Sequence, residues 1–364
     1  MKEKTKSKKY IPSFFIFTAV FTILSYILLL ICRGSASVSD FLNRYVLQYV
    51  RLALASITSF LPFSLFEILL ILLLPLLVAF IVATVKYTES TRGRVRSVLS
   101  LISVICLIFT AHIYTLGISY NTTDLAKKLD IPSNIEINKK ALYDTAALVS
   151  DKVNDLADKV DFSDGETHLP YSFRELSEHI TEAYNTLEEE YPIFDNFASY
   201  AKPVMNSSIM SDMGITGIYS YFTGEANINM SYPDYNLPFV VAHEFAHQRG
   251  FARENEANFI AYLVCISSDE PYVQYSGYLS MYEYLSSALY RTDKELYTAV
   301  LSELNSVARA DMAASVAVTR AHRDSFLYKT MDKVNDAYLK ANGTEGVISY
   351  SYVVRLAVAY YREK

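Results

Sequence analysis

The sequence predicts an N-terminal α-helical membrane region with three transmembrane helices, followed by a mostly helical α+β domain with a small β-sheet. Apolar residues are concentrated in the first third of the 364-residue chain, whereas the remainder has the charge density of a soluble domain. Within that remainder, apolar side chains recur with a helical period over residues 139–160 and 173–191. We therefore expect a membrane anchor over residues 1–120 and a second domain over residues 121–364.

Three apolar stretches are long enough to cross a hydrocarbon core of about 30 Å, near residues 11–32, 66–85 and 98–118. The first stretch has no charged residue and is longer than the apolar part of a cleavable signal peptide, so we expect it to stay as an anchor. Pro75 interrupts the second stretch, which a helix in lipid tolerates when neighbouring groups satisfy the freed backbone. The lipid bilayer is therefore an expected partner.

Basic residues predict the orientation of these spans. The chain opens on a basic segment, and residues 86–96, between the second and third spans, are also strongly basic. Because two spans separate these segments, both must lie on the same side, and the positive-inside rule makes that side cytoplasmic. We therefore expect a multi-pass cell-membrane protein with a cytoplasmic N-terminus and an extracytoplasmic C-terminal domain.

Residues 38–60 carry Asp40, Arg44 and Arg51 at roughly helical spacing among apolar side chains. This pattern predicts an amphipathic helix that lies on or near the outer membrane surface. A fourth, poorly hydrophobic span is the alternative, and it would invert the orientation of everything that follows. His112, inside the third span, is expected to be an interfacial or helix-packing residue.

The stretch 214–230 departs from the helical period. Its glycines separate two short β-favouring segments, 218–222 and 226–230, which predict a small strand unit. We expect the pieces around Glu225 and Asn227 to form an edge that pairs with an extended peptide, with a capping or solvated Glu225 as the alternative.

A histidine pair with the spacing of a zinc site lies in a predicted helix that starts near Leu237 and stops near Gly250. His243 and His247 are four residues apart and share one helical face, and Glu244 between them can reach a water molecule bound to the same ion. Zinc in such sites takes three protein ligands, keeps a fourth position open and lowers the pKa of its bound water toward about 7. The sequence therefore predicts a Zn²⁺ cofactor, with Glu244 as the catalytic base.

A third ligand is expected from the next predicted helix, because Gly250 lets the chain reverse. Glu254 is the preferred candidate and Glu256 the alternative, since the two point about 200° apart on an ideal helix. Asn258 lies on the same face as Glu254, where it is expected to hydrogen-bond a metal ligand and orient it.

This pattern resembles that of the gluzincin zinc peptidases, in which a helix with HExxH precedes a helix with ExxxD. The chain has Asn258 where aspartate is usual, and its connection is shorter than in most such enzymes. Residues 254–259 also resemble the ExxAN segment of the zinc proteins that cleave phage repressors.

Over nearly its full length, the chain resembles a bacterial membrane family catalogued as domain of unknown function 3810. Five segments carry this resemblance: residues 61–64, 223–227, 243–259, 334–340 and 346–350. The resemblance implies a zincin-like metallopeptidase domain and brings no established substrate. His322 and Tyr350 are candidate oxyanion stabilisers, a role that His or Tyr takes in related enzymes.

Together these features predict a membrane-anchored, zinc-dependent, metallopeptidase-like hydrolase that acts on a peptide or protein at the outer membrane face. The alternative is a non-catalytic, zinc-binding membrane sensor or scaffold. The net charge of −6 argues against a nucleic-acid partner, because phosphate neutralisation needs a basic surface.

Overall fold

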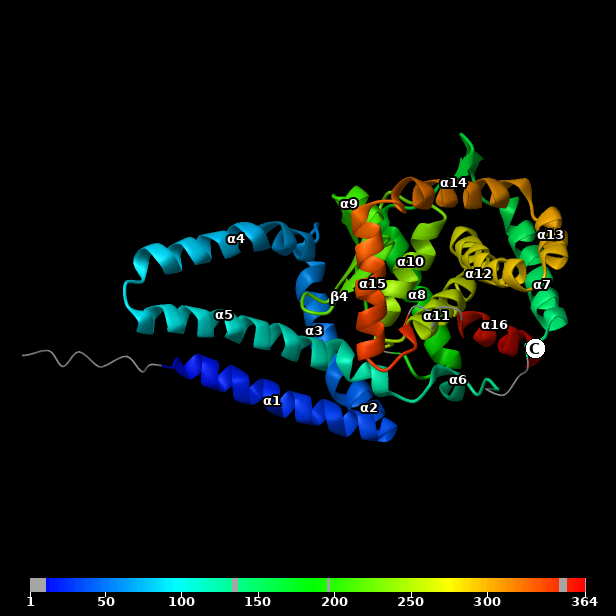
Figure 1. Ribbon diagram of the computed structural model, residues 1–364. Helices are drawn as coiled ribbons and strands as arrows, with labels where there is room; N and C mark the ends of the chain where they lie inside the picture. Colours follow the sequence, from blue (N-terminus) through cyan, green and yellow to red (C-terminus); the bar gives the residue numbers. More distant parts are fainter. Residues whose placement is uncertain (1–10, 133–136, 195–196, 347–351, 364) are drawn as a thin grey trace, which may run out of the picture.

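The computed structural model describes residues 11–132, 137–194, 197–346 and 352–363. The described chain is mostly helical (Figure 1). Three long helices extend side by side from one side of a compact helical domain that contains two small sheets.

The three long helices are α1 (Ser13–Gly34), α4 (Leu65–Tyr87) and α5 (Thr91–His112). Each is long and apolar enough to cross a membrane, which confirms the three predicted spans. Beyond α5, the third span continues through a π-helical turn, η2 (Ile113–Gly117), and a 3₁₀ turn, η3 (Ser119–Asn121).

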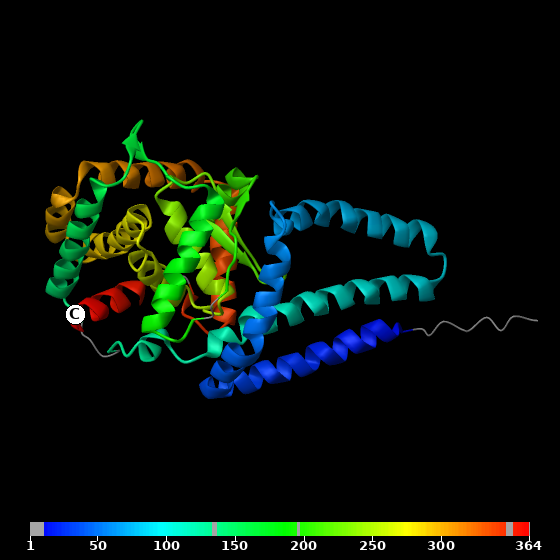
Figure 2. The ribbon, with the colours of Figure 1, turned by 180° about the vertical axis from the view of Figure 1, so that it is seen from behind.

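A shorter helical segment runs across the ends of these spans (Figure 2). It consists of α2 (Ala36–Leu42), the π-helical turn η1 (Asn43–Leu47) and α3 (Gln48–Ser59). Among the described residues, the helices that are long and apolar enough to span a membrane do not include this segment. The arrangement therefore favours the predicted amphipathic helix over a fourth span.

The second domain is built mainly from helices around one apolar core. The helices that contribute most to this core are α7 (Lys139–Ala157), α8 (Phe173–Glu190), α10 (Asn236–Gln248), α11 (Glu254–Ile266), α12 (Pro271–Thr292) and α16 (Tyr352–Glu363). The smaller or peripheral helices are α6 (Leu125–Lys128), α9 (Ser207–Asp212), α13 (Lys294–Glu303), α14 (Ser306–His322) and α15 (Phe326–Ala341). Both helices predicted from apolar periodicity, α7 and α8, are confirmed to within three residues at each end. A capping box of Ser172 and Glu175 explains why α8 begins where it does.

A three-stranded sheet lies beside α10. Its order is β3 (Lys202–Val204), β5 (Glu225–Asn229) and β4 (Gly217–Ser220), with β5 parallel to β3 and antiparallel to β4. The strands predicted at 218–222 and 226–230 are confirmed with small shifts, whereas β3 and the two-residue pair β1 (Phe162–Ser163) and β2 (Glu166–Thr167) were not predicted.

The position of β5 corrects one prediction. Glu225 and Asn227 lie on this central, fully buried strand, so the expected edge around them is wrong. Because β5 has a neighbour on both sides, β3 and β4 are the edge strands of this sheet, and β4 is the edge strand that lies against α10 at Val240 and Glu244.

The first turn of α4 is hydrogen-bonded to this sheet. The Glu225 carboxylate accepts from the backbone N–H groups of Leu65 and Phe66, as an acidic group at a helix N-terminus does. In return, the Glu67 carboxylate accepts from the backbone N–H groups of Met205 and Asn206, just after β3. Glu225 is therefore a cap, and the spans and the second domain form one packed structure.

Candidate metal centre

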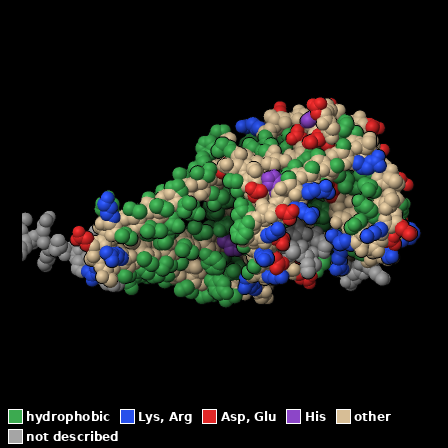
Figure 3. Space-filling view, turned by 45° about the horizontal axis from the view of Figure 1, so that its top comes forward, with side chains coloured by type: hydrophobic (Ala, Val, Ile, Leu, Met, Phe, Trp, Pro, Cys, Tyr) green, Lys and Arg blue, Asp and Glu red, His purple; other side chains and the backbone are tan. Residues whose placement is uncertain are grey.

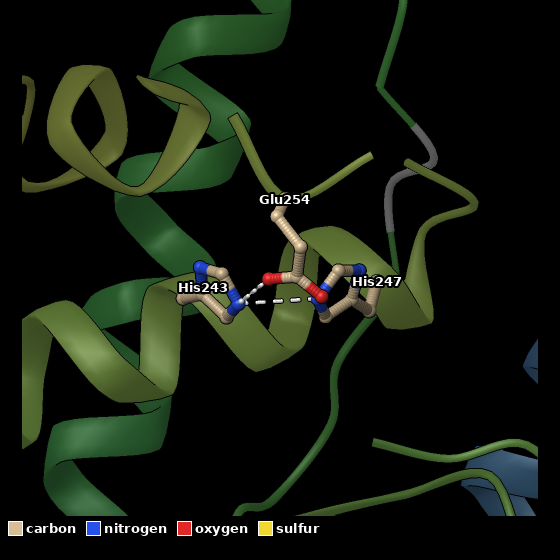
Figure 4. Close-up of side chains that lie close together, drawn as sticks. All are labelled: His243, His247 and Glu254. Atoms are coloured by element: carbon tan, nitrogen blue, oxygen red, sulfur yellow. Dashed lines mark hydrogen bonds and ion pairs between the residues drawn. The ribbon is translucent and has the colours of Figure 1, made fainter. Parts of the chain in front are cut away.

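The two motif histidines project from one face of α10 toward each other. His243 Nε2 and His247 Nε2 are 3.1 Å apart (Figure 4). One helical turn separates the residues, which is why their side chains meet. The helix is held in place because the other residues of its motif, Glu244, Phe245 and Ala246, are buried in the domain core.

Glu254, the first residue of α11, completes the cluster. Its carboxylate oxygens lie 3.4 Å from His243 Nε2 and 3.6 Å from His247 Nε2, and one ligand atom from each residue lies within 4.8 Å of the others. Two ligand atoms bound about 2.0–2.1 Å from one tetrahedral zinc ion are roughly 3.3 Å apart. The three side chains therefore have the spacing that a single zinc ion requires.

The loop between α10 and α11 brings Glu254 into this position. Gly250 has φ +87°, a conformation that side-chain-bearing residues rarely adopt, and it reverses the chain directly after α10. The carbonyl of Phe251 then accepts a hydrogen bond of 2.8 Å from His247 Nδ1. This bond occupies Nδ1 and leaves Nε2 of His247 to face His243 and Glu254, the arrangement of a histidine that binds metal.

The charges of the cluster favour a cation at its centre. Burial lowers the pKa of His247, but the charge and hydrogen bond of Glu254 outweigh it and raise the pKa of His247 to about 9. Burial likewise opposes ionisation of Glu254, but the two imidazoles hold the pKa of its carboxyl well below the ordinary value. A proton or a metal cation supplies the positive charge that this arrangement requires.

Glu244 lies beside the cluster and is 3% exposed. Burial raises the pKa of Glu244, although His243 and His247 oppose this shift, and the backbone N–H of Tyr219 on β4 donates to its carboxylate. Its Oε2 has no hydrogen-bond partner among the described residues. Glu244 is therefore a buried carboxylate with raised proton affinity and one free oxygen, which suits a general base.

Of the two candidate third ligands, the structure brings only Glu254 to the histidines. Glu256 is 4% exposed and accepts from the backbone N–H of Leu125 at 2.8 Å and from Arg253 Nη1 at 2.7 Å. Asn258 is also buried, but its Nδ2 has no partner among the described residues. Its role in orienting a ligand stays a prediction.

The two candidate oxyanion stabilisers are not part of the described cluster. His322, at the end of α14, has its Nδ1 2.7 Å from Asp212 Oδ1 of α9. Within the described ranges, none of its hydrogen bonds or ion pairs involves His243, His247 or Glu254. Tyr350 lies outside the described residues.

Segments next to the spans hold the loop that carries the third ligand. Asn43 Nδ2 of η1 donates to the carbonyl of Gly250 at 3.2 Å. Arg253 Nη2 donates to the carbonyls of Tyr120 and Thr122, at the end of the third span, at 3.0 and 2.6 Å. The position of Glu254 therefore depends on these segments, which the sequence patterns did not connect with the site.

Gly217 of β4 is a further residue of the site that the sequence motifs did not indicate. A side chain there would place its Cβ 2.6 Å from Glu244 Oε1 and 2.7 Å from Val240 Cγ1. Only glycine lets β4 pass this close to the carboxylate. In the sequence, the glycines of residues 214–230, just before the histidine motif, were the feature that could have indicated this close approach.

The family model for a protein of unknown function, DUF3810, matches residues 43–358. The chain belongs to this family. The match contains the whole cluster and also α3, α4 and α5, so two of the three spans and the candidate metal centre lie within the family match, whereas α1 precedes it. Asn43, whose side chain holds Gly250, is the first matched residue. Neither a curated protein nor a solved structure matches the chain.

Proposed function

We propose that this protein is a membrane-anchored, zinc-dependent hydrolase of the metallopeptidase type. The convergence of His243, His247 and Glu254 is the observation that carries the proposal (Figure 4), and the charges of all three act on the neighbouring Glu244. The resemblance of the motif to the gluzincin pattern supports the same assignment. Zinc fits because two imidazoles and one carboxylate form a usual donor set for a catalytic zinc ion.

When bound, zinc supplies Lewis acidity toward a carbonyl and a water molecule. His243, His247 and Glu254 hold the ion, and the bond from His247 Nδ1 to the Phe251 carbonyl orients one ligand. Glu244 accepts a proton from the attacking water and later delivers it to the amine that leaves as the peptide bond breaks. Its burial, which raises the pKa of its carboxyl, favours this proton transfer.

The free edge of β4 suits a peptide or protein substrate. It runs directly beside Glu244, and one of its backbone N–H groups, that of Tyr219, already points toward that carboxylate. An extended peptide that pairs with such an edge brings its backbone carbonyls close to the catalytic group. The distribution of basic residues supports an active site on the outer face of the membrane.

The zinc content of the purified full-length protein tests the proposal. We expect one zinc ion per chain in the wild type, none after His243→Ala, and an unchanged content after His168→Ala, a control histidine near β2 that is not in the cluster. Glu244→Gln is expected to keep the zinc and to abolish hydrolysis. A wild-type protein without zinc, or a His243→Ala variant that retains it, would refute the assignment.

One observation supports a second candidate, a sensor or scaffold that binds zinc without hydrolysis. The loop that carries Glu254 is hydrogen-bonded through Asn43 and Arg253 to segments at the ends of the spans. A movement of this loop on zinc binding would therefore shift those segments. Glu244→Gln separates the candidates. A cellular phenotype that survives this substitution while zinc stays bound favours the sensor.

A further inference from the structure

The free edge strand beside Glu244 ends at the membrane spans. At one end of β4, Gly217 lies against the Glu244 carboxylate. Just past the other end, the ring of Tyr221 contacts His112 at the end of α5, with centroids 5.2 Å apart. From Gly217 to Tyr221 is four residues, or roughly 13 Å of extended chain. A peptide paired with β4 therefore reaches the third span within one short strand of the catalytic carboxylate.

A second route joins the third span to the third ligand. The ring of Tyr338 on α15 contacts both His112 and Tyr120, with centroids 5.8 and 6.3 Å apart. The carbonyl of Tyr120 also accepts from Arg253, the residue before Glu254, and Asn43 holds Gly250 of the same loop, so the end of the span is hydrogen-bonded to the loop that carries the ligand.

The segment α2–α3 turns its charges toward the protein. Asp40 accepts from Thr123 and pairs with Lys128 at 3.1 Å, Arg44 pairs with Glu188 at 3.0 Å, and Arg51 is fully buried against Asn43. The opposite side of the segment, which we call the α3 face, is apolar and exposed. It consists of Phe41, Tyr45, Tyr49, Ile57 and Phe60, and Phe60 is 87% exposed.

Lipid is the occupant that fits the α3 face. The face is continuous with α4, which starts five residues after Phe60 and is apolar around its whole circumference. Apolar side chains cover the visible surface of the spans, and the surface is hollowed where the spans meet the domain (Figure 3). A helix with paired charges on one side and large apolar residues on the other lies in the membrane interface.

We propose that the metal centre acts on polypeptides that are themselves anchored in the bilayer, and that it cleaves them in the few residues next to the membrane. This inference rests on the proposed hydrolase function and names its substrate class. The α3 face holds the domain on the outer leaflet, and β4 receives a chain that has just left the lipid. An anchored substrate needs only a few extended residues to reach Glu244.

Tryptophan fluorescence tests whether the α3 face lies in lipid, because the chain contains no tryptophan of its own and an introduced indole is the only one present. Phe60→Trp places a single indole on the α3 face, and Leu148→Trp places one at an exposed position on α7, on the side of the domain away from the spans. Each full-length variant is reconstituted in phosphatidylcholine liposomes that contain lipids brominated near the top of the acyl chain.

We expect the brominated lipids to quench more than half of the Phe60→Trp emission and to leave the Leu148→Trp emission unchanged. Tyr49→Trp, also on the α3 face, is expected to behave like Phe60→Trp. If neither position on the α3 face is quenched more than Leu148→Trp, the face is not in lipid. That result overturns the inference and leaves the zinc hydrolase proposal standing.

Mapping of protein N-termini tests the substrate class. N-termini are labelled in cells that express the wild type or Glu244→Gln, and those that disappear in the variant are located in their proteins. We expect them to lie within about ten residues of a membrane span, on its outer side, a reach of roughly 35 Å in extended chain. N-termini in soluble proteins, or far from any span, would overturn the inference alone. If no N-termini disappear while both proteins bind zinc, the hydrolase proposal fails and the inference with it.

Discussion

Substitution of Gly250 by alanine probes the loop that joins the two metal-binding helices. Gly250 has φ +87°, and an alanine there costs about 1–2 kcal/mol in backbone strain. Its Cβ would also lie 2.6 Å from Asn43 Oδ1 and 2.7 Å from Arg51 Cζ, where ordinary contacts begin near 3.4 Å. Asn43 holds the Arg51 guanidinium at 2.9 and 3.0 Å, so neither group can move freely. Relief of this overlap costs about 1–3 kcal/mol more.

The overlap also acts on the metal centre. The shortfall of about 0.8 Å has to be taken up by the loop, and Phe251, the next residue, accepts the hydrogen bond that orients His247. Loss of such a supporting bond typically weakens metal binding by about 10- to 100-fold. We therefore expect Gly250→Ala to lose about 2–5 kcal/mol of stability and to bind zinc 10- to 100-fold more weakly.

Gly343→Ala is the matched control, because Gly343 also has φ +87° and its added Cβ meets no atom of another part of the described chain within 4 Å. It is expected to lose only the 1–2 kcal/mol of backbone strain and to bind zinc like the wild type. Thermal unfolding measures stability, and competition with a chromophoric chelator measures zinc affinity, both on the full-length protein. Equal losses of stability in the two variants, with zinc affinity unchanged in both, would refute the claim that Asn43 and Arg51 hold the loop in the position that zinc binding needs.

Three further predictions address other parts of the structure. Gly217→Ala moves the Glu244 carboxylate without touching a metal ligand, so zinc content should stay at the wild-type level while the rate of cleavage falls about 100-fold; loss of zinc would contradict this. Glu256→Gln removes the buried carboxylate that pairs with Arg253, which keeps Asp124 as a second partner, so thermal unfolding should show a loss of about 1–3 kcal/mol. Burial raises the pKa of Glu283 from 4.5 to about 7, so the stability associated with its protonated form is present below pH 4.5 and is lost as the pH rises through 7. The loss is about 3 kcal/mol, and unfolding of Glu283→Gln from pH 4.5 to 8 should lack it.

The membrane spans and the histidine pair could be predicted because their information is local. A membrane span can be recognised from the length and composition of one apolar stretch, without reference to the rest of the chain. His243 and His247 lie on one helix, so the spacing of four residues alone places their side chains on one face. The same reasoning identified α7 and α8, whose apolar residues recur with the helical period.

The third ligand and the surroundings of the site could not be decided in this way. Glu254 and Glu256 are two residues apart in one acidic segment, and their different roles depend on where the loop places the start of α11. The edge predicted near Glu225 was wrong because β3, a strand of only three residues, pairs with the far side of β5. Such a short strand has too few residues to show an alternating pattern.

The sequence by itself therefore determined the apolar helices of the anchor and the helix with the histidine pair. Only the tertiary structure decided that Glu254 joins the histidines, that Gly217 makes room for Glu244, and that membrane-proximal segments hold the site together. The physical reason is distance along the chain. The contact between Asn43 and Gly250 joins residues 207 positions apart, and no local pattern of side chains encodes a hydrogen bond over that separation.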